Sequence, residues 1–106
     1  VFYLAQDENE NYVGFLSYEI NSAPRKTKIH KIYLLPASQG KGVGAALIRR
    51  VAEIATENQN TALILNVNRF NKAIGFYEKM GFEAQLLLFL LMTNRNLYLR
   101  HNLHQS

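Results

Sequence analysis

Residues 39–45 read Gln39-Gly40-Lys41-Gly42-Val43-Gly44-Ala45 and separate a strand-like run from a helix-like run. The upstream run, Lys28 to Leu35, alternates in polarity and then becomes continuously apolar, which predicts a strand that enters a sheet and ends at Pro36. The downstream run predicts a helix from Gly42 to about Asn58, because its apolar residues recur about every 3.6 positions. Those residues are Val43, Leu47, Val51, Ile54 and Ala55, with Ala46 and Ile48 widening the stripe.

The segment before this unit predicts an antiparallel hairpin. Phe2, Leu4 and the run Tyr12 to Tyr18 are rich in β-forming residues, and the polar segment Gln6 to Asn11 suits a tight connection between them. A further turn is predicted at Asn21-Ser22-Ala23-Pro24. Three strands therefore precede the glycine-rich turn.

The segment after the first helix predicts a strand and a second helix. Ala62 to Val67 is a short apolar run rich in β-formers, which is typical of a central strand. Asn71 is predicted to cap a helix that Gly81 ends in the left-handed conformation, with Phe82 packing back on it. The inner face of this helix holds Ala73, Ile74, Tyr77 and Met80.

The tail predicts two more strands, Gln85 to Met92 and Leu97 to Leu99, joined by Thr93-Asn94-Arg95-Asn96. The whole order of elements predicts a single α/β (α+β) domain over residues 1–106. Its central sheet is expected to be mixed and mostly antiparallel, with helices on its faces.

The composition excludes several classes of protein. A chain of 106 residues with 48% hydrophobic and 19% charged residues can bury a core, so it is neither a disordered tail nor a coiled coil. The lack of cysteine excludes disulfides, thiolate zinc sites and a cysteine nucleophile, and a cytoplasmic location is expected. The longest apolar run, Leu86 to Met92, is far shorter than the ~20 residues of a membrane-spanning helix. No metal site is predicted, since His101 and His104 lie in the tail and do not make a convincing ligand pair.

The net charge of +4 is unevenly distributed. Residues 1–23 hold acidic residues and no Lys or Arg, whereas residues 24–50 hold only basic ones: Arg25, Lys26, Lys28, Lys31, Lys41, Arg49 and Arg50. A basic segment suits a phosphate-bearing small molecule. Nucleic acid is a less favoured partner, because the motifs that read its grooves are missing.

The glycine-rich turn predicts a diphosphate site. The first turn of a helix has backbone N–H groups without partners, and these attract anions. Gly40, Gly42 and Gly44 have no side chains to block a phosphate, and Lys41 adds positive charge. The spacing excludes a P-loop, and Gly40-x-Gly42-x-x-Ala45 matches a dinucleotide fingerprint only in its permissive form. A flexible connector is the alternative without a ligand.

Two motifs together resemble a known family. Ile32-Tyr33-Leu34-Leu35-Pro36 followed by Gln39-Gly40-Lys41-Gly42-Val43-Gly44 resembles the acetyl-CoA signature of the GNAT N-acetyltransferases, Arg/Gln-x-x-Gly-x-Gly/Ala. The run Asn66 to Phe82 resembles the second motif of the same family. The resemblance covers roughly Val1 to Phe82 and implies the fold and activity of an acetyl-CoA-dependent N-acetyltransferase.

The resemblance also implies a cosubstrate site. The pyrophosphate of acetyl-CoA is expected on the turn made of Gln39, Gly40, Lys41, Gly42, Val43, Gly44 and Ala45. The pantetheine arm is expected to bond along the strand at Tyr33, Leu34 and Leu35, as an added strand would. Asn71 matches the asparagine that contacts CoA, with Asn68 as the reserve.

Tyr77 matches the family's general acid, which protonates the departing thiolate. Without the resemblance, a tyrosine on the inner face of a helix is more often a core residue. The general base is open, because the strand Ala62 to Val67 has no acidic residue. His30 is the candidate, because histidine is the side chain whose charge changes near neutral pH; Glu19 is comparable, and a water chain is a third route.

Two departures from the family bear on the acceptor. The strand and helices that usually precede the segment matching Val1 are not found in this sequence, and residues 84–106 match the family poorly, so a fragment or a divergent or truncated member is expected. The expected acceptor is a small-molecule or peptide amine. A homodimer through Leu86 to Met92 would cover that apolar run. A non-catalytic CoA-binding or protein-interaction module is the main alternative function.

Overall fold

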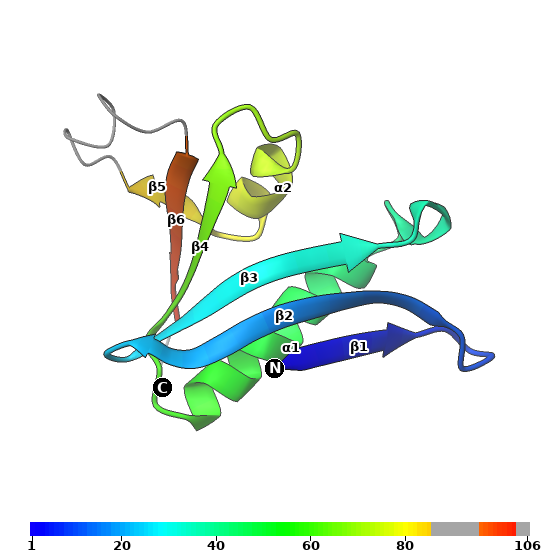
Figure 1. Ribbon diagram of the computed structural model, residues 1–106, viewed down its shortest axis with the longest axis horizontal. Coiled ribbons are helices and arrows are strands. Elements are labelled where there is room, and N and C mark those ends of the chain that lie inside the picture. The colour runs from blue at the N-terminus through cyan, green and yellow to red at the C-terminus, as the bar shows by residue number, and fades with distance from the viewer. Residues whose placement is uncertain (86–95, 104–106) are drawn as a thin grey trace.

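A computed structural model of the chain describes residues 1–85 and 96–103. Figure 1 shows strands that form one curved sheet, with the longer helix lying across its back. The elements are β1 (Phe2–Gln6), β2 (Tyr12–Ala23), β3 (Lys26–Leu34), the 3₁₀ turn η1 (Pro36–Ser38), α1 (Val43–Glu57), β4 (Ala62–Asn68), α2 (Ile74–Lys79), β5 (Glu83–Gln85) and β6 (Asn96–Asn102).

Within the described residues, the strands form a six-stranded sheet in the order β1-β2-β3-β4-β6-β5. The pairing of β3 with β4 is parallel and every other pairing is antiparallel. The mixed, mostly antiparallel sheet predicted from the sequence is therefore confirmed. The parallel pairing extends only from Lys26↔Ala62 to Lys28↔Ile64, after which the two strands diverge (Figure 1).

The predicted hairpin is confirmed, but β2 is longer than expected. It extends through Asn21 to Ala23, where the sequence predicts a turn, and only Pro24 and Arg25 separate it from β3. Asn60 accounts for this, because its Nδ2 donates to Asn21 Oδ1 at 2.7 Å. Asn21 itself has a φ of +57°, and the pairing of β2 with β3 is interrupted between Glu19 and Ala23, so the tertiary partner holds an irregular strand where local propensity favours a turn.

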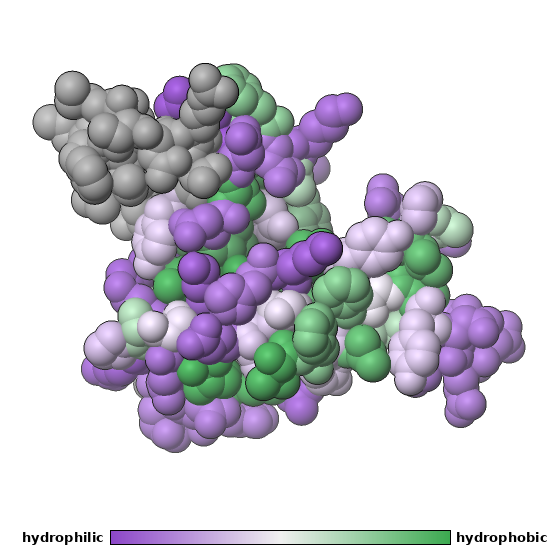
Figure 2. Space-filling view, in the orientation of Figure 1, coloured by the Kyte–Doolittle hydropathy of each residue, from purple (hydrophilic) through white to green (hydrophobic). Residues whose placement is uncertain are grey.

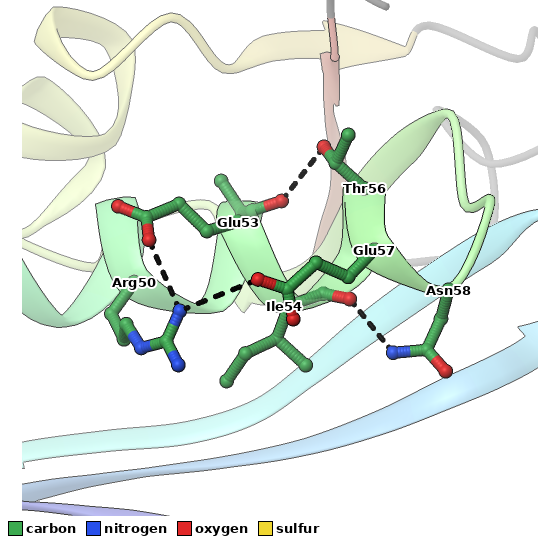
Figure 3. Close-up of polar contacts among 7 residues, drawn as sticks. Arg50, Glu53, Ile54, Thr56, Glu57 and Asn58 are labelled. Atoms are coloured by element: carbon green, nitrogen blue, oxygen red, sulfur yellow. Dashed lines mark hydrogen bonds and ion pairs between the residues drawn. The ribbon is translucent and has the colours of Figure 1, made fainter.

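The predicted first helix is confirmed, with Gly42 as the N-cap and Asn58 as the C-cap of α1. Its solvent-exposed side carries polar contacts, which Figure 3 shows. Arg50 Nη1 lies 3.0 Å from Glu53 Oε2 and 3.8 Å from Glu57 Oε1. Such exposed pairs contribute little to stability, so α1 is held by its buried face. That face consists of Gly44, Leu47, Ile48, Val51 and Ala55.

The core lies between α1 and one face of the sheet. Leu16 from β2, Ile29 from β3, Leu63 from β4 and Leu99 from β6 are buried in it. The opposite face of β1–β3 is exposed, and Figure 2 shows apolar side chains gathered on part of it beside hydrophilic ones. Phe2 and Phe15 pack edge to face there with ring centroids 5.6 Å apart, and Tyr33 extends the row at 5.9 Å from Phe15.

The beginning of α2 corrects the prediction for Asn71. The N-cap is Ala73, and the first regular helical bond runs from the Tyr77 N–H to the Ala73 carbonyl at 3.0 Å. Asn71 instead forms a turn before the helix, in which its Oδ1 accepts from the Ala73 N–H at 2.7 Å. The side chain satisfies a backbone donor as expected, but the chain completes a tight turn before it becomes helical.

The end of α2 agrees with the sequence. Gly81 has a φ of +103°, and the Phe82 N–H donates to the Tyr77 carbonyl at 3.0 Å, which closes the helix.

In the tail, β6 contains the predicted strand Leu97 to Leu99. Of the predicted strand Gln85 to Met92, only Gln85 is described, as the end of β5, and Leu86 to Met92 lie outside the described residues. No helix in the described part of the chain is long and apolar enough to cross a membrane.

Candidate active site

A cavity of about 530 Å³ lies beside the point where β3 leaves β4. It is bounded by the second half of β3, the glycine-rich turn, the first turn of α1, and α2. The residues that line it are Ile32, Leu34, Gln39, Gly40, Gly42, Gly44, Ala45, Ala73, Phe76 and Tyr77. Two motifs that are distant in the sequence therefore share one cavity.

The glycine-rich turn leaves room for a ligand at the N-terminus of α1. Gly40 and Gly42 have φ angles of +77° and +81°, and a β-carbon on either would meet no atom within 4 Å. No side chain caps α1, and its first backbone bond runs from the Ala46 N–H to the Gly42 carbonyl at 3.0 Å. The N–H groups before Ala46 in this turn have no intrahelical acceptor, and such groups at a helix N-terminus can receive an anion.

Gly44 allows α1, α2 and β3 to meet closely. A β-carbon at this position would lie 3.2 Å from Phe76 Cζ and 3.4 Å from Leu34 Cδ1. Both neighbours line the cavity, so the missing side chain sets the distance between its walls.

Tyr77 lies on the inner side of α2 and is 6% exposed. Its ring packs between those of Phe76 and Phe82, at centroid distances of 5.5 and 5.8 Å. Burial raises the pKa of the Tyr77 phenol above its usual value of 10.0, because the charged phenolate is poorly solvated there. The side chain is therefore a neutral proton donor over the whole physiological range.

The predicted cosubstrate residues divide into two groups in space. Leu34, Gln39, Gly40, Gly42, Gly44 and Ala45 line the 530 Å³ cavity together with Tyr77. Leu35, Lys41 and Val43 instead line a larger cavity of about 870 Å³ on the other side of the turn, against the β1–β2 hairpin. Tyr33 turns its ring to the open face of the sheet, and Asn71 lines neither cavity.

His30 lies on the face of the sheet away from α1. A register shift places it as an extra residue between the pairs Tyr18↔Ile29 and Ser17↔Lys31. Its Nε2 lies 3.0 Å from Glu19 Oε1, and both side chains are exposed. His30 does not line the cavity that holds Tyr77, but it follows closely on Lys28, the last residue of β3 paired with β4.

Ile32, Ala73 and Phe76 line the cavity but were not predicted as site residues. The sequence feature that could have identified Phe76 and Ala73 as site residues is their position in the second motif, where Phe76 precedes Tyr77 and Ala73 lies two residues after Asn71. Ile32 could have been found from strand alternation, since it shares a face with Leu34.

The comparisons with known proteins show the family of the chain. The family described as Acetyltransferase (GNAT) family matches residues 1–82. An uncharacterised N-acetyltransferase of Methanocaldococcus jannaschii is 36% identical over 83 residues, which are 73% of this chain and 37% of the relative. The chain thus spans little more than a third of that protein's length.

Two crystal structures share the fold. The structure of nourseothricin acetyltransferase has a TM-score of 0.83 and 26% identity, over 97% of this chain and 65% of that one. The PaiA N-acetyltransferase of Thermoplasma acidophilum, solved in complex with coenzyme A, has a TM-score of 0.82 and 21% identity, over 96% of this chain and 60% of that one. With the family match covering most of its length, the chain belongs to the GNAT family of acetyltransferases.

Proposed function

We propose that the protein is an N-acetyltransferase that moves an acetyl group from acetyl-CoA to a primary amine. The observation that carries the proposal is the single cavity shared by the glycine-rich turn at the α1 N-terminus and by Tyr77. A helix N-terminus that can receive an anion and a buried proton donor on the walls of one cavity suit a thioester that carries a diphosphate.

The chain's own residues fit the cosubstrate. The diphosphate would accept hydrogen bonds from the N–H groups of the turn, where the positive φ angles of Gly40 and Gly42 leave the space in front open. The pantetheine arm would lie along β3 beyond Lys28, where β4 no longer occupies the strand edge. Leu34 and Phe76 would enclose it on the α1 side.

The chemistry is direct transfer without a covalent intermediate on the protein. The amine nitrogen attacks the thioester carbonyl carbon, a C–N bond forms, and the C–S bond breaks. Tyr77 gives its phenolic proton to the sulfur, and the proton lost by the amine passes to a base and returns to the phenol through solvent. Holding both substrates together supplies most of the rate enhancement.

We assign the base to His30 within this proposal. The Glu19 carboxylate can only accept a hydrogen bond, so the 3.0 Å contact requires a proton on His30 Nε2 and leaves Nδ1 as the basic nitrogen. The acceptor would then reach the opening between β3 and β4 from the face opposite the cavity. A small-molecule or peptide amine is proposed as acceptor, in line with the relative named for nourseothricin.

A cytoplasmic location belongs to the same proposal and rests on the lack of cysteine. The predicted dimer through Leu86 to Met92 concerns residues outside the described part of the chain.

Calorimetry and a thiol-release assay test the proposal together. Acetyl-CoA is expected to bind, and a panel of amines, including streptothricin-type antibiotics, polyamines and peptides, is expected to yield free CoA for at least one member. Tyr77→Phe is expected to lower kcat about 100-fold with unchanged acetyl-CoA affinity. Binding without turnover on any amine would instead identify a non-catalytic CoA-binding module.

A further inference from the structure

His101 of β6 connects the sheet to the end of α2. Its Nδ1 lies 3.0 Å from the Gly81 carbonyl oxygen. Because a carbonyl oxygen has no proton to give, Nδ1 carries the hydrogen and donates it. Among the described residues, this is the side-chain hydrogen bond that joins the closing turn of α2 to the sheet.

The same imidazole packs against the turn from the side. Its centroid lies 5.5 Å from that of Phe82, and a β-carbon on Gly81 would lie 2.7 Å from its Cε1. The absence of a side chain at Gly81 therefore serves two purposes, since it permits the φ of +103° and admits the ring of His101.

The contact continues from His101 to Tyr77. Phe82 is 2% exposed and lies between the two, 5.8 Å from the Tyr77 ring in an edge-to-face arrangement. The Phe82 N–H also donates to the Tyr77 carbonyl at 3.0 Å. Tyr77 is thus fixed at its backbone and at its ring by a residue that His101 holds in place.

The position of His101 in the sheet makes it a rigid support. It pairs in register with Leu63 of β4, which is fully buried. By contrast, α2 is a helix of six residues whose N-cap, Ala73, makes no side-chain capping bond, and short helices have little stability of their own. The orientation of such a helix depends on what holds its ends.

We propose that His101 is a positioning residue that aims the Tyr77 hydroxyl into the 530 Å³ cavity by bracing the Gly81–Phe82 turn. The inference rests on the proposed role of Tyr77 as general acid. It assigns His101 no contact with substrate, and it predicts an effect on the chemical step with no effect on cosubstrate binding.

Two substitutions separate the hydrogen bond from the ring packing. His101→Phe keeps a ring against Phe82 and removes the donor, whereas His101→Asn places an amide N–H where Nδ1 was and removes the ring. His101→Phe is expected to lower kcat about tenfold, with unchanged acetyl-CoA affinity, because misplacing a reacting group costs rate rather than binding. His101→Asn is expected to retain most of the activity, and Asn102→Ala, next on the strand and exposed, is the control expected to match the wild type.

A double-mutant cycle distinguishes positioning from general stability. In a Tyr77→Phe background, His101→Phe is expected to cause no further loss of kcat, because the group that it positions is gone. Equal losses in both backgrounds would overturn the proposal.

A readout independent of turnover uses 3-fluorotyrosine at position 77. His101→Phe is expected to shift the ¹⁹F resonance and to lower the titration midpoint of the phenol toward that of an exposed tyrosine, while His101→Asn leaves both near the wild-type values. An unchanged ¹⁹F titration in His101→Phe would overturn the proposal, even for a protein that acetylates no amine. If His101→Phe does not fold, as judged by circular dichroism, His101→Leu replaces it, and its ¹⁹F shift and titration midpoint are compared with those of the wild type and of His101→Asn.

Discussion

The ring of Phe76 lies 3.2 Å from the point that a β-carbon on Gly44 would occupy. A methyl group between helices α1 and α2 would therefore require Phe76 to shift by a few tenths of an ångström, and both Gly44 and Phe76 line the cavity.

Gly44→Ala is expected to lower acetyl-CoA affinity about tenfold because Phe76 and Leu34 must move. The free energy of unfolding should fall by about 0–2 kcal/mol, since overpacking costs ~1–3 kcal/mol and the better helix propensity of alanine returns ~1 kcal/mol. Calorimetry and urea unfolding measure the two effects. Gly75→Ala is the matched control, because its new methyl group meets no atom within 4 Å; equal affinities of the two variants would contradict the expectation.

Gly42→Ala is expected to weaken acetyl-CoA binding at least tenfold and to leave acetyl-pantetheine binding unchanged, because only the former has a diphosphate. The φ of +81° costs alanine about 1–2 kcal/mol, and its methyl group occupies the open space before the α1 N–H groups. Gly42→Asn tolerates the left-handed conformation better and should recover stability but not affinity. A parallel loss for both ligands would argue against a diphosphate site at this turn.

His30→Gln is expected to lower kcat/KM for the amine about 100-fold, because it removes the proposed base. Glu19→Gln is expected to lower it less, because a glutamine at position 19 still accepts the hydrogen bond from His30 but has no charge to hold the imidazole. Acetyl-CoA affinity should not change, since neither residue lines the cavity. Steady-state kinetics measure the effect. The neighbouring Lys31→Gln is the control; an equally active His30→Gln would exclude His30 as the base.

Stability should fall at alkaline pH because of Tyr77. Burial raises the pKa of its phenol above 10.0 in the folded state, so between that pH and the folded pKa the unfolded chain has lost a proton that the folded chain keeps. The contribution of the Tyr77 phenol to the free energy of unfolding is fully present below pH ~10. It is lost as the pH rises, with a slope of up to about 1.4 kcal/mol per pH unit. Urea unfolding between pH ~8 and ~11 should show a shallower decline for Tyr77→Phe, and identical slopes would show that burial does not shift this group.

Asn60→Ala is expected to cost about 2–4 kcal/mol of unfolding free energy. Asn60 is fully buried where β3 and β4 begin to pair, and its Oδ1 accepts from Thr27 Oγ1 at 2.7 Å and from the Asn21 N–H at 3.2 Å. Thr27→Val keeps the shape and removes one donor, so about 1–2 kcal/mol is expected. The exposed Asn58→Ala is the control in the same urea titration; a cost for Asn60→Ala no larger than for Asn58→Ala would contradict a supporting role for this network.

The parts of the fold that could be predicted from the sequence are those with local causes. The α1 boundaries follow from apolar spacing and from Gly42, and the end of α2 follows from Gly81, because a helix and its caps are specified within a few residues. The start of α2 was less predictable: the Asn71 side chain bonds a nearby N–H both in a cap and in a turn, and the residue type alone does not distinguish the two.

By itself, the sequence determined the order of elements, the position of the glycine-rich turn before α1 and the family. Only the tertiary structure decided which side chains share a cavity. Strand alternation places Tyr33 and Leu34 on opposite faces, but the extra residue at His30 changes the register of β3 against β2, and no local pattern reveals such a shift. Likewise, the opening between β3 and β4 depends on where their pairing stops, at Lys28↔Ile64. His101 reaches the Gly81 carbonyl only because β6 pairs with β4. These arrangements are set by the packing of residues that lie far apart in the chain.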